Sequence, residues 1–371
     1  MRREGIGRIR ARANLPLLLV VTGLTVYGTV VVRSATSGMP GADGMIGRHV
    51  LGLAIGLVPL LVAWALDYQK LKGWIGPLAV LNALLIISPR IPGLGDTAKG
   101  ATSWLQVAGF RLFQPSEPAK LITIVIMAAV ISGFKGRIEQ PRDVLRVLAH
   151  LAVPLTLILM QPDLGTGLVF VAITLGMLLV GGLRPRWFLV FALVGVLVTG
   201  VVLKAGLLED YQEDRLLVFV DPARDPLGAG YNLAQSKIAI GSGGISGKGL
   251  YSGTQGNLNF LPERHTDFVF AVLGEELGFL GVVGLLALYL GLLVVSLEVA
   301  TSSRDLFGAL IAAGLISMWA FQILENVGMT VGIMPITGIP LPFISFGSSF
   351  MVTNLAGTGM LLSVWARRYG A

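Results

Sequence analysis

Apolar residues recur along this chain in ten blocks, each about as long as a helix needs to be to cross ~30 Å of hydrocarbon. Only 13% of the residues are charged, about half the share of a soluble domain. Such a chain cannot cover a surface that faces water. We therefore predict an all-α, polytopic membrane protein with one membrane domain over residues 1–371. The blocks cover residues 15–33, 49–66, 73–89, 115–133, 147–161, 164–182, 187–205, 267–297, 305–325 and 345–365.

The basic residues predict how the chain is oriented in the membrane. With the N-terminus inside, the cytoplasmic connections hold sixteen Lys and Arg and the short outer loops hold five. Because positive residues concentrate on the cytoplasmic side of a membrane, both termini are predicted to be cytoplasmic. The net charge of +7 is explained by this distribution, so nucleic acid is not an expected partner.

The chain contains no cysteine and only three histidines. This composition excludes disulfides, thiolate metal sites and cysteine nucleophiles. No metal site and no cofactor is predicted, although a divalent cation is compatible with the acidic residues described below.

One connection, residues 206–266, is much longer than the others and forms a large extracytoplasmic loop. Loops of this length are usually functional. We expect an amphipathic helix from Tyr231 to Ile240, ended by Gly241, with its apolar face at the membrane interface. The glycine-rich run Ser242–Gly249 resembles a phosphate-binding loop but lacks its first glycine and its Ser or Thr. We expect that run to be a flexible loop.

Two groups of polar residues lie at the outer ends of spans four to six. Glu117 and Lys120 share one helical face at membrane depth, where charges are costly and often functional; a structural ion pair is the alternative. Trp104 either anchors the membrane interface or contacts a substrate. Asp163 either caps the helix that follows it or holds a cation or a substrate hydroxyl.

Two further groups lie at the outer ends of spans eight and ten. Glu263, Arg264, His265, Thr266 and Asp267 crowd the entry to span eight, which is more than a helix cap requires. Glu275 and Glu276 lie deeper in the same span. The proline-rich run 335–349, which contains Ser345, predicts irregular backbone at membrane depth, tolerated only where protein packs around it or where it lines a cavity.

The runs 113–120, 161–165, 261–267, 275–278 and 338–349 occur in the order of the SEDS family (shape, elongation, division and sporulation). The chain resembles this family over its whole length, and its elongation branch more than its division branch. The resemblance implies a peptidoglycan glycosyltransferase of the bacterial cytoplasmic membrane that polymerises lipid II. It also implies a class B penicillin-binding protein as partner.

The family's essential outer-loop aspartate falls on Asp267, which is the predicted catalytic residue. The predicted substrate-binding residues are Trp104, Arg111, Glu117, Lys120, Asp163, Glu263, Arg264, His265 and Ser345. The chain departs from the family pattern at Ser103, often arginine, and at Phe346, usually tyrosine. A lipid II flippase, a division-type member of the family and a scaffold that only recruits partners are the alternative interpretations.

Overall fold

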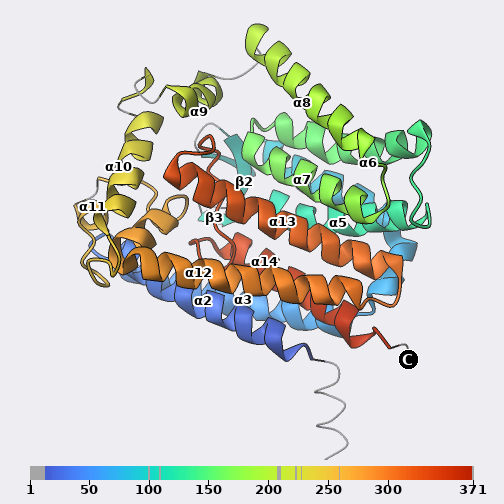
Figure 1. Ribbon diagram of the computed structural model, residues 1–371, viewed down its shortest axis with the longest axis horizontal. Helices are drawn as coiled ribbons and strands as arrows, with labels where there is room; N and C mark the ends of the chain where they lie inside the picture. Colours follow the sequence, from blue (N-terminus) through green and yellow to red (C-terminus); the bar gives the residue numbers. More distant parts are fainter. Residues whose placement is uncertain are drawn as a thin grey trace, which may run out of the picture. The chain divides into compact units, whose positions relative to one another are not determined.

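The computed structural model describes residues 13–98, 101–107, 110–206, 210–221, 224–226, 228–258 and 260–369 (Figure 1). The chain divides into two compact units. Unit 1 comprises Met1–Val62, Asp214–Ser296 and Trp319–Gly359, and unit 2 comprises Ala63–Glu213, Leu297–Met318 and Met360–Ala371.

Each of the ten predicted spans coincides with a helix. These helices are α2 (Leu15–Thr36), α3 (Ala42–Ala65), η1 and α4 (Tyr68–Trp74 and Ile75–Ile87), α5 (Ser116–Ser132), α6 (Pro141–Leu159), α7 (Leu164–Val180), α8 (Arg186–Lys204), α12 (Val269–Thr301), α13 (Leu306–Val331) and α14 (Ser348–Ala366). Among the described residues, seven candidate spans are long and apolar enough to cross a membrane, and α7 is a shorter apolar helix. The chain is therefore an all-α, multi-pass membrane protein, as predicted.

In unit 2, α4 packs against α5 and α6, and α7 packs against the same two helices. Ala119, Ile124 and Met127 of α5 are fully buried, since this helix is surrounded by its neighbours. A buried hydrogen bond from Asn82 Nδ2 to Thr123 Oγ1, 2.8 Å long, joins α4 to α5. The N-terminal ends of α5 and α7 carry the polar residues singled out in the sequence.

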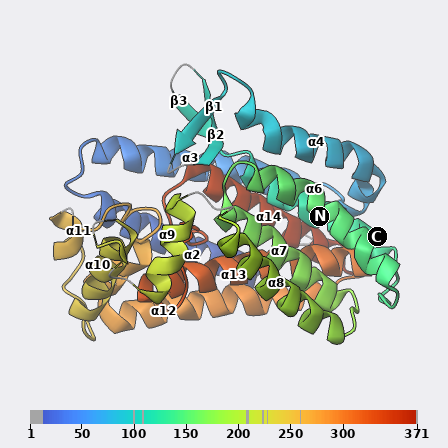
Figure 2. The same cartoon turned by 90° about the horizontal axis from the view of Figure 1, so that it is seen from above.

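A small sheet, which the sequence analysis did not anticipate, precedes α5. Its strands β1 (Gly95–Ala98), β2 (Ala101–Val107) and β3 (Phe110–Phe113) are antiparallel, in the order β1-β2-β3 (Figure 2). The short 3-10 helix η2 (Ser88–Arg90) lies against β1 and β2. The sheet therefore fixes the position of Trp104, which lies on β2.

In unit 1, glycines allow the backbones of neighbouring helices and loops to come into direct contact. A Cβ atom at Gly52 of α3 would lie 2.9 Å from Ser348 Cα at the start of α14. One at Gly28 of α2 would lie 2.7 Å from Ile344 Cα, in the loop before α14. Such close approach through small residues is the usual way in which membrane helices associate.

Helix α12 is broken inside the predicted eighth span, where a continuous helix was expected. Gly278 has φ 63° and ψ −162°, a conformation that is essentially restricted to glycine. The run 243–249 supplies the hydrogen bonds that the break removes. The amides of Lys248 and Gly249 donate to the carbonyls of Glu275 and Glu276, at 3.0 and 2.9 Å.

On the other side of the break, the amides of Phe279 and Leu280 donate to the carbonyls of Gly244 and Ile245, at 2.9 and 3.1 Å. The glycine-rich run is thus an ordered part of the helix break, and the predicted flexible loop is wrong. Broken helices persist at membrane depth when neighbouring segments satisfy the freed backbone groups in this way.

The large loop is mostly helical and packs on protein. It contains α9 (Asp210–Val220), α10 (Ala229–Ser242) and α11 (Thr254–Asn257). Helix α10 contains the predicted helix but ends at Ser242, with Gly243 as its C-cap. Its buried Leu233 and Ala239 join a core cluster with Phe268 and Met329, so its apolar face covers protein and not the predicted membrane interface.

Gly278→Ala is expected to destabilise the protein. Its Cβ atom would lie 2.7 Å from Ile245 O and still closer to Gly247 N, and the backbone strain alone costs about 1–3 kcal/mol. The unfolding temperature in detergent should therefore fall. Gly284→Ala in the same helix is the matched control, because nothing lies within 4 Å of its Cβ position. Equal unfolding temperatures for both variants would contradict the assigned break.

Candidate functional site

The turn that leads into α12 is organised around one carbonyl group. Glu263 has φ 52°, which is uncommon for a residue with a side chain. This conformation lets its carbonyl accept hydrogen bonds from the amides of Thr266, Asp267 and Phe268, at 3.2, 3.1 and 3.2 Å. The turn places the buried Asp267, 8% exposed, two residues before Val269, the first residue of α12.

The loop before α14 lies against this turn and is tied to it by hydrogen bonds. Ser345 Oγ donates to Thr266 O at 2.7 Å and accepts from Leu341 N at 2.8 Å. The Phe346 amide donates to His265 O at 2.9 Å. Ile339, Leu341, Phe343 and Ile344 of the loop are buried, which agrees with irregular backbone packed in protein. The sequence-predicted groups of spans eight and ten therefore do meet.

The side chain of Asn326 in α13 joins the turn before α12 to the loop before α14. Its Nδ2 donates to Asp267 O at 2.9 Å and to Ile339 O at 2.8 Å. The side chain is fully buried. Because a buried amide with two such acceptors is held in one orientation, it fixes the backbone on which the Asp267 carboxylate is carried.

The Asp267 carboxylate faces Gly338 and lies near a guanidinium group. A Cβ atom at Gly338 would lie 3.3 Å from Asp267 Oδ2 and 3.9 Å from Arg215 Nη1. Arg215 of α9 also donates to Thr337 O at 3.5 Å. Because Gly338 has no side chain, its loop can approach the Asp267 carboxylate closely.

Arg264 attaches the turn before α12 to the C-terminal end of α2. Its Nε donates to Ala35 O at 2.6 Å and its Nη2 to Ser37 O at 3.2 Å, at the C-terminal end of α2, where orphan carbonyls favour a cation. Burial lowers the pKa of Arg264. The predicted substrate-binding arginine is thus engaged with protein carbonyls.

Glu275 and Glu276 of α12 accept hydrogen bonds from neighbouring segments of the chain. Glu275 Oε1 accepts from Lys248 Nζ at 2.6 Å and from the amide and hydroxyl of Thr254, each at 2.8 Å. Glu276 accepts from Ser34 Oγ at 2.6 and 2.8 Å. Glu275 therefore holds the segment 248–254 on α12, and Glu276 joins α12 to α2.

In unit 2, Glu117 and Lys120 form a buried ion pair in the first turn of α5. Lys120 Nζ lies 2.9 Å from Glu117 Oε1, and the two residues are 2% and 3% exposed. Among the described residues, Glu117 Oε2 and the neighbouring Ser116 Oγ are buried without a hydrogen-bond partner. Unsatisfied buried groups are costly, so this turn has capacity for a further polar contact.

The other predicted residues of unit 2 lie on the sheet and on α7. Trp104 is half-buried on β2, where it pairs with Asp96. Asp163 caps α7, accepting from Thr166 N at 3.0 Å and Thr166 Oγ1 at 2.8 Å, so the capping interpretation is confirmed for this residue. Arg111 belongs to β3, and its side chain lies outside the described part of the structure.

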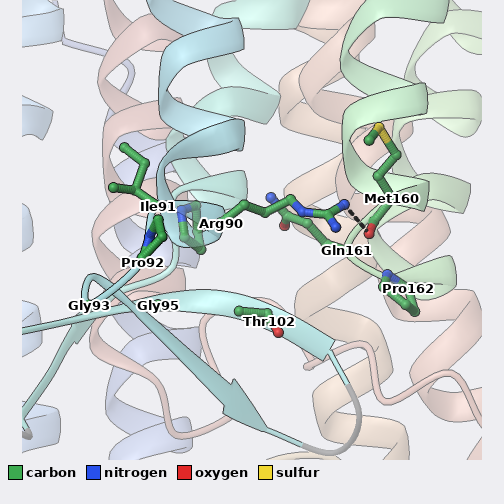
Figure 3. A pocket seen from close by; sticks show the side chains of 10 residues that line it. Arg90, Ile91, Pro92, Gly93, Gly95, Thr102, Met160, Gln161 and Pro162 are labelled. Atoms are coloured by element: carbon green, nitrogen blue, oxygen red, sulfur yellow. Dashed lines mark hydrogen bonds between the residues drawn. The ribbon is translucent and has the colours of Figure 1, made fainter.

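A cavity of about 520 Å³ in unit 2 lies between η2, the sheet and the α6–α7 turn (Figure 3). Arg90 crosses it and donates from Nη1 to Met160 O at 2.6 Å. Gln161 at its wall donates to Ile86 O. The Gln161–Asp163 turn singled out in the sequence thus borders a polar cavity.

Sequence reasoning missed Arg215, Asn326 and Glu325. Glu325 of α13 is 3% exposed and accepts a 2.9 Å hydrogen bond from Thr337 Oγ1. An acidic residue inside a predicted span is itself a functional signal, so Glu325 was identifiable. Among the described residues, no group of three or more His, Asp or Glu side chains is placed to hold a metal ion.

Comparisons with known proteins agree on one family. The family model of the FtsW/RodA/SpoVE cell cycle proteins matches residues 14–369. The peptidoglycan glycosyltransferase MrdB of Escherichia coli (strain K12) is 38% identical over 361 residues, 95% of this chain and 93% of MrdB.

Two solved structures share the fold over nearly the whole chain. One chain of a peptidoglycan synthase complex that coordinates polymerization and crosslinking has a TM-score of 0.80 at 32% identity, covering 96% of this chain and 98% of that chain. The rod shape determining protein RodA of Thermus thermophilus has a TM-score of 0.71 at 29% identity, covering 96% and 97%.

Proposed function

Because the chain belongs to the FtsW/RodA/SpoVE family of cell cycle proteins, we propose that it is a peptidoglycan glycosyltransferase that polymerises lipid II. The observation that carries this function is the buried Asp267, held where the turn before α12 meets the loop before α14, beside Arg215 and Gly338. The likeness to the rod shape determining protein RodA of Thermus thermophilus, with a TM-score of 0.71 at 29% identity, supports the elongation role over the division role. The proposed reaction takes place at the outer face of the bacterial cytoplasmic membrane.

In the proposed reaction, an acceptor sugar hydroxyl attacks the anomeric carbon of the donor. The new C–O bond forms as the bond to the lipid diphosphate breaks, so the bonding electrons leave with undecaprenyl pyrophosphate. The hydroxyl proton passes to the Asp267 carboxylate, which acts as general base. Arg215, near the Asp267 carboxylate in unit 1, is the cation proposed to neutralise the diphosphate.

The polymerase activity is tested with the purified protein and labelled lipid II. We expect a ladder of glycan polymer and release of undecaprenyl pyrophosphate. A purified, folded protein that makes no polymer but moves lipid II between the leaflets of sealed vesicles would instead establish the flippase. The flippase is kept as the alternative because it would also explain why Glu117, Lys120 and Glu325 are buried charged residues.

The proposed site requires both termini to be cytoplasmic and residues 206–266 to face the outside. Because the chain has no cysteine, single cysteines can report this directly. Leu258→Cys, at a side chain 62% exposed, should react with a membrane-impermeant maleimide in intact spheroplasts. Tyr369→Cys, at 85% exposed, should react only after lysis. The reverse pattern would invert the topology and remove the site from the outer face.

We further propose a single-pass, class B penicillin-binding protein as partner, bound along α12. Phe279, Val283, Leu286, Leu290 and Val294 follow helical spacing on α12, and all are exposed. The match to a chain of a peptidoglycan synthase complex supports such an assembly. We expect Leu290→Trp combined with Val294→Trp to weaken co-purification of the transpeptidase and to remove its stimulation of polymerisation. Full co-purification of the double variant would place the partner elsewhere.

Helices α3, α12, α13 and α14 each contribute residues to both units. This shared construction supports the proposal that residues 1–371 act as one membrane domain. Helix α9 is divided in the same way, so separate expression of either unit would leave five helices cut.

A further inference from the structure

His49 of α3 is a buried imidazole that the proposed reaction leaves unused. The residue is 1% exposed, and among the described residues neither ring nitrogen has a hydrogen-bond partner. A buried polar group without a partner costs about 1–3 kcal/mol. Native proteins rarely keep such a group unless a water, an ion or a ligand satisfies it.

The imidazole lies where the two loops of the proposed site meet. Its ring stacks on the Phe346 ring, with centroids 6.1 Å apart and planes inclined by 24°. The His265 ring contacts the same phenyl group, at 5.3 Å. Phe346 donates its amide to His265 O, so His49 is joined by direct contacts to the turn that carries Asp267.

The part of α3 that contains His49 packs beside the N-terminal end of α14, a helix of 19 residues. Gly52, one turn further along α3, meets Ser348, the first residue of α14, with 2.9 Å between its Cβ position and Ser348 Cα. Gly56 meets Val352 in the same way, so α3 and α14 run in the same direction there. His49 precedes Gly52 by three residues, about 4.5 Å along α3, and so lies level with the residues just before α14. The N-terminus of a helix carries a partial positive charge and attracts anions.

We infer that His49 and the N-terminal end of α14 bind a phosphate oxygen of the lipid-linked diphosphate. The imidazole N–H is the donor, and Phe346 holds the ring in place. This inference rests on the proposed function, because it assigns the diphosphate of that substrate to these residues. His49 is then a substrate-binding residue in unit 1, additional to those predicted from the sequence.

His49→Phe separates binding from packing. A phenyl ring keeps the stack on Phe346 and removes both unsatisfied nitrogens, so the unfolding temperature should stay the same or rise. Loss of one hydrogen bond to a charged group should weaken binding about 10- to 100-fold. His49→Gln, which retains a donor, should recover part of the affinity. His150→Phe, at an exposed histidine of α6, is the matched control.

The binding probe is geranylgeranyl pyrophosphate, read by thermal stabilisation of the purified protein, beside the KM for lipid II. We expect weaker pyrophosphate binding and a higher KM for His49→Phe, with stabilisation by phosphatidylglycerol unchanged. Unchanged pyrophosphate affinity in this variant overturns the inference, as does a loss confined to phosphatidylglycerol, which would assign the site to a phospholipid headgroup. If the unmodified protein makes no polymer yet loses pyrophosphate binding on substitution, the proposed function fails and the anion site stands.

Discussion

Asp267→Asn is expected to lower the polymerisation rate by roughly 10²–10⁴-fold while the protein stays folded. The amide keeps the shape of the carboxylate but cannot accept the acceptor's proton. The Asn326 hydrogen bond reaches Asp267 through its backbone carbonyl, so the substitution leaves that attachment in place. If Asp267 only stabilised the helix start, the same change would cost about 1 kcal/mol or less and leave turnover nearly intact.

Two further variants make the Asp267 test specific. Glu263 is the nearest rival carboxylate, but it is exposed and accepts from the Thr266 hydroxyl at 2.9 Å. Glu263→Gln should therefore reduce turnover far less than Asp267→Asn, and the opposite order would transfer the base to Glu263. Glu298→Gln, at an exposed position of α12, controls for the loss of one negative charge. Polymer formation and thermal unfolding are measured on each purified variant.

Removing Lys120 alone should have the second largest effect. Lys120→Met leaves the buried Glu117 without its cation, which typically costs about 3–5 kcal/mol. The unfolding temperature should fall clearly. Adding Glu117→Gln removes the uncompensated charge, so the double variant should regain most of the stability.

Activity then decides what the pair does. If the pair only locks α5, the stable double variant and the exchange of Glu117→Lys with Lys120→Glu should both polymerise lipid II at near-normal rates. If Lys120 neutralises the substrate's diphosphate, both variants should be stable and nearly inactive, since the cation is missing or displaced. An active exchange variant would assign the pair to structure alone.

The spans were predictable because the bilayer sets their length independently of tertiary contacts. The break at Gly278 was not, because its hydrogen-bond partners, Gly244 to Gly249, lie far earlier in the chain. A glycine in an apolar run gives no local sign of such pairing. The apolar residues of α10 indicate a helix face that avoids water. They do not indicate whether lipid or protein covers that face, and in the structure it is protein.

The site was partly predictable because ionisable residues are conspicuous among apolar ones. Asp267 was identified in this way and Ser345 through the proline-rich run 335–349, and the structure brings their loops together in unit 1. Asn326 was missed because an uncharged amide does not stand out in a span, and Arg215 because it lies in the charged run 209–215 of the long loop, outside the predicted spans. Arg264 drew attention by its charge, although its hydrogen bonds go to the end of α2. The residue type shows that a charged side chain is energetically costly at membrane depth, whereas the group that it contacts depends on the fold.

The most direct test of the central claim separates substrate binding from bond formation at Asp267. Lipid II is first bound to excess purified protein, and the first glycosidic bond is then followed in a single turnover. We predict that Asp267→Asn binds lipid II with nearly unchanged affinity and forms the bond roughly 10²–10⁴-fold more slowly than the unmodified protein. A folded Asp267→Asn protein that forms the first bond at the normal rate would contradict the assignment of Asp267 as the base.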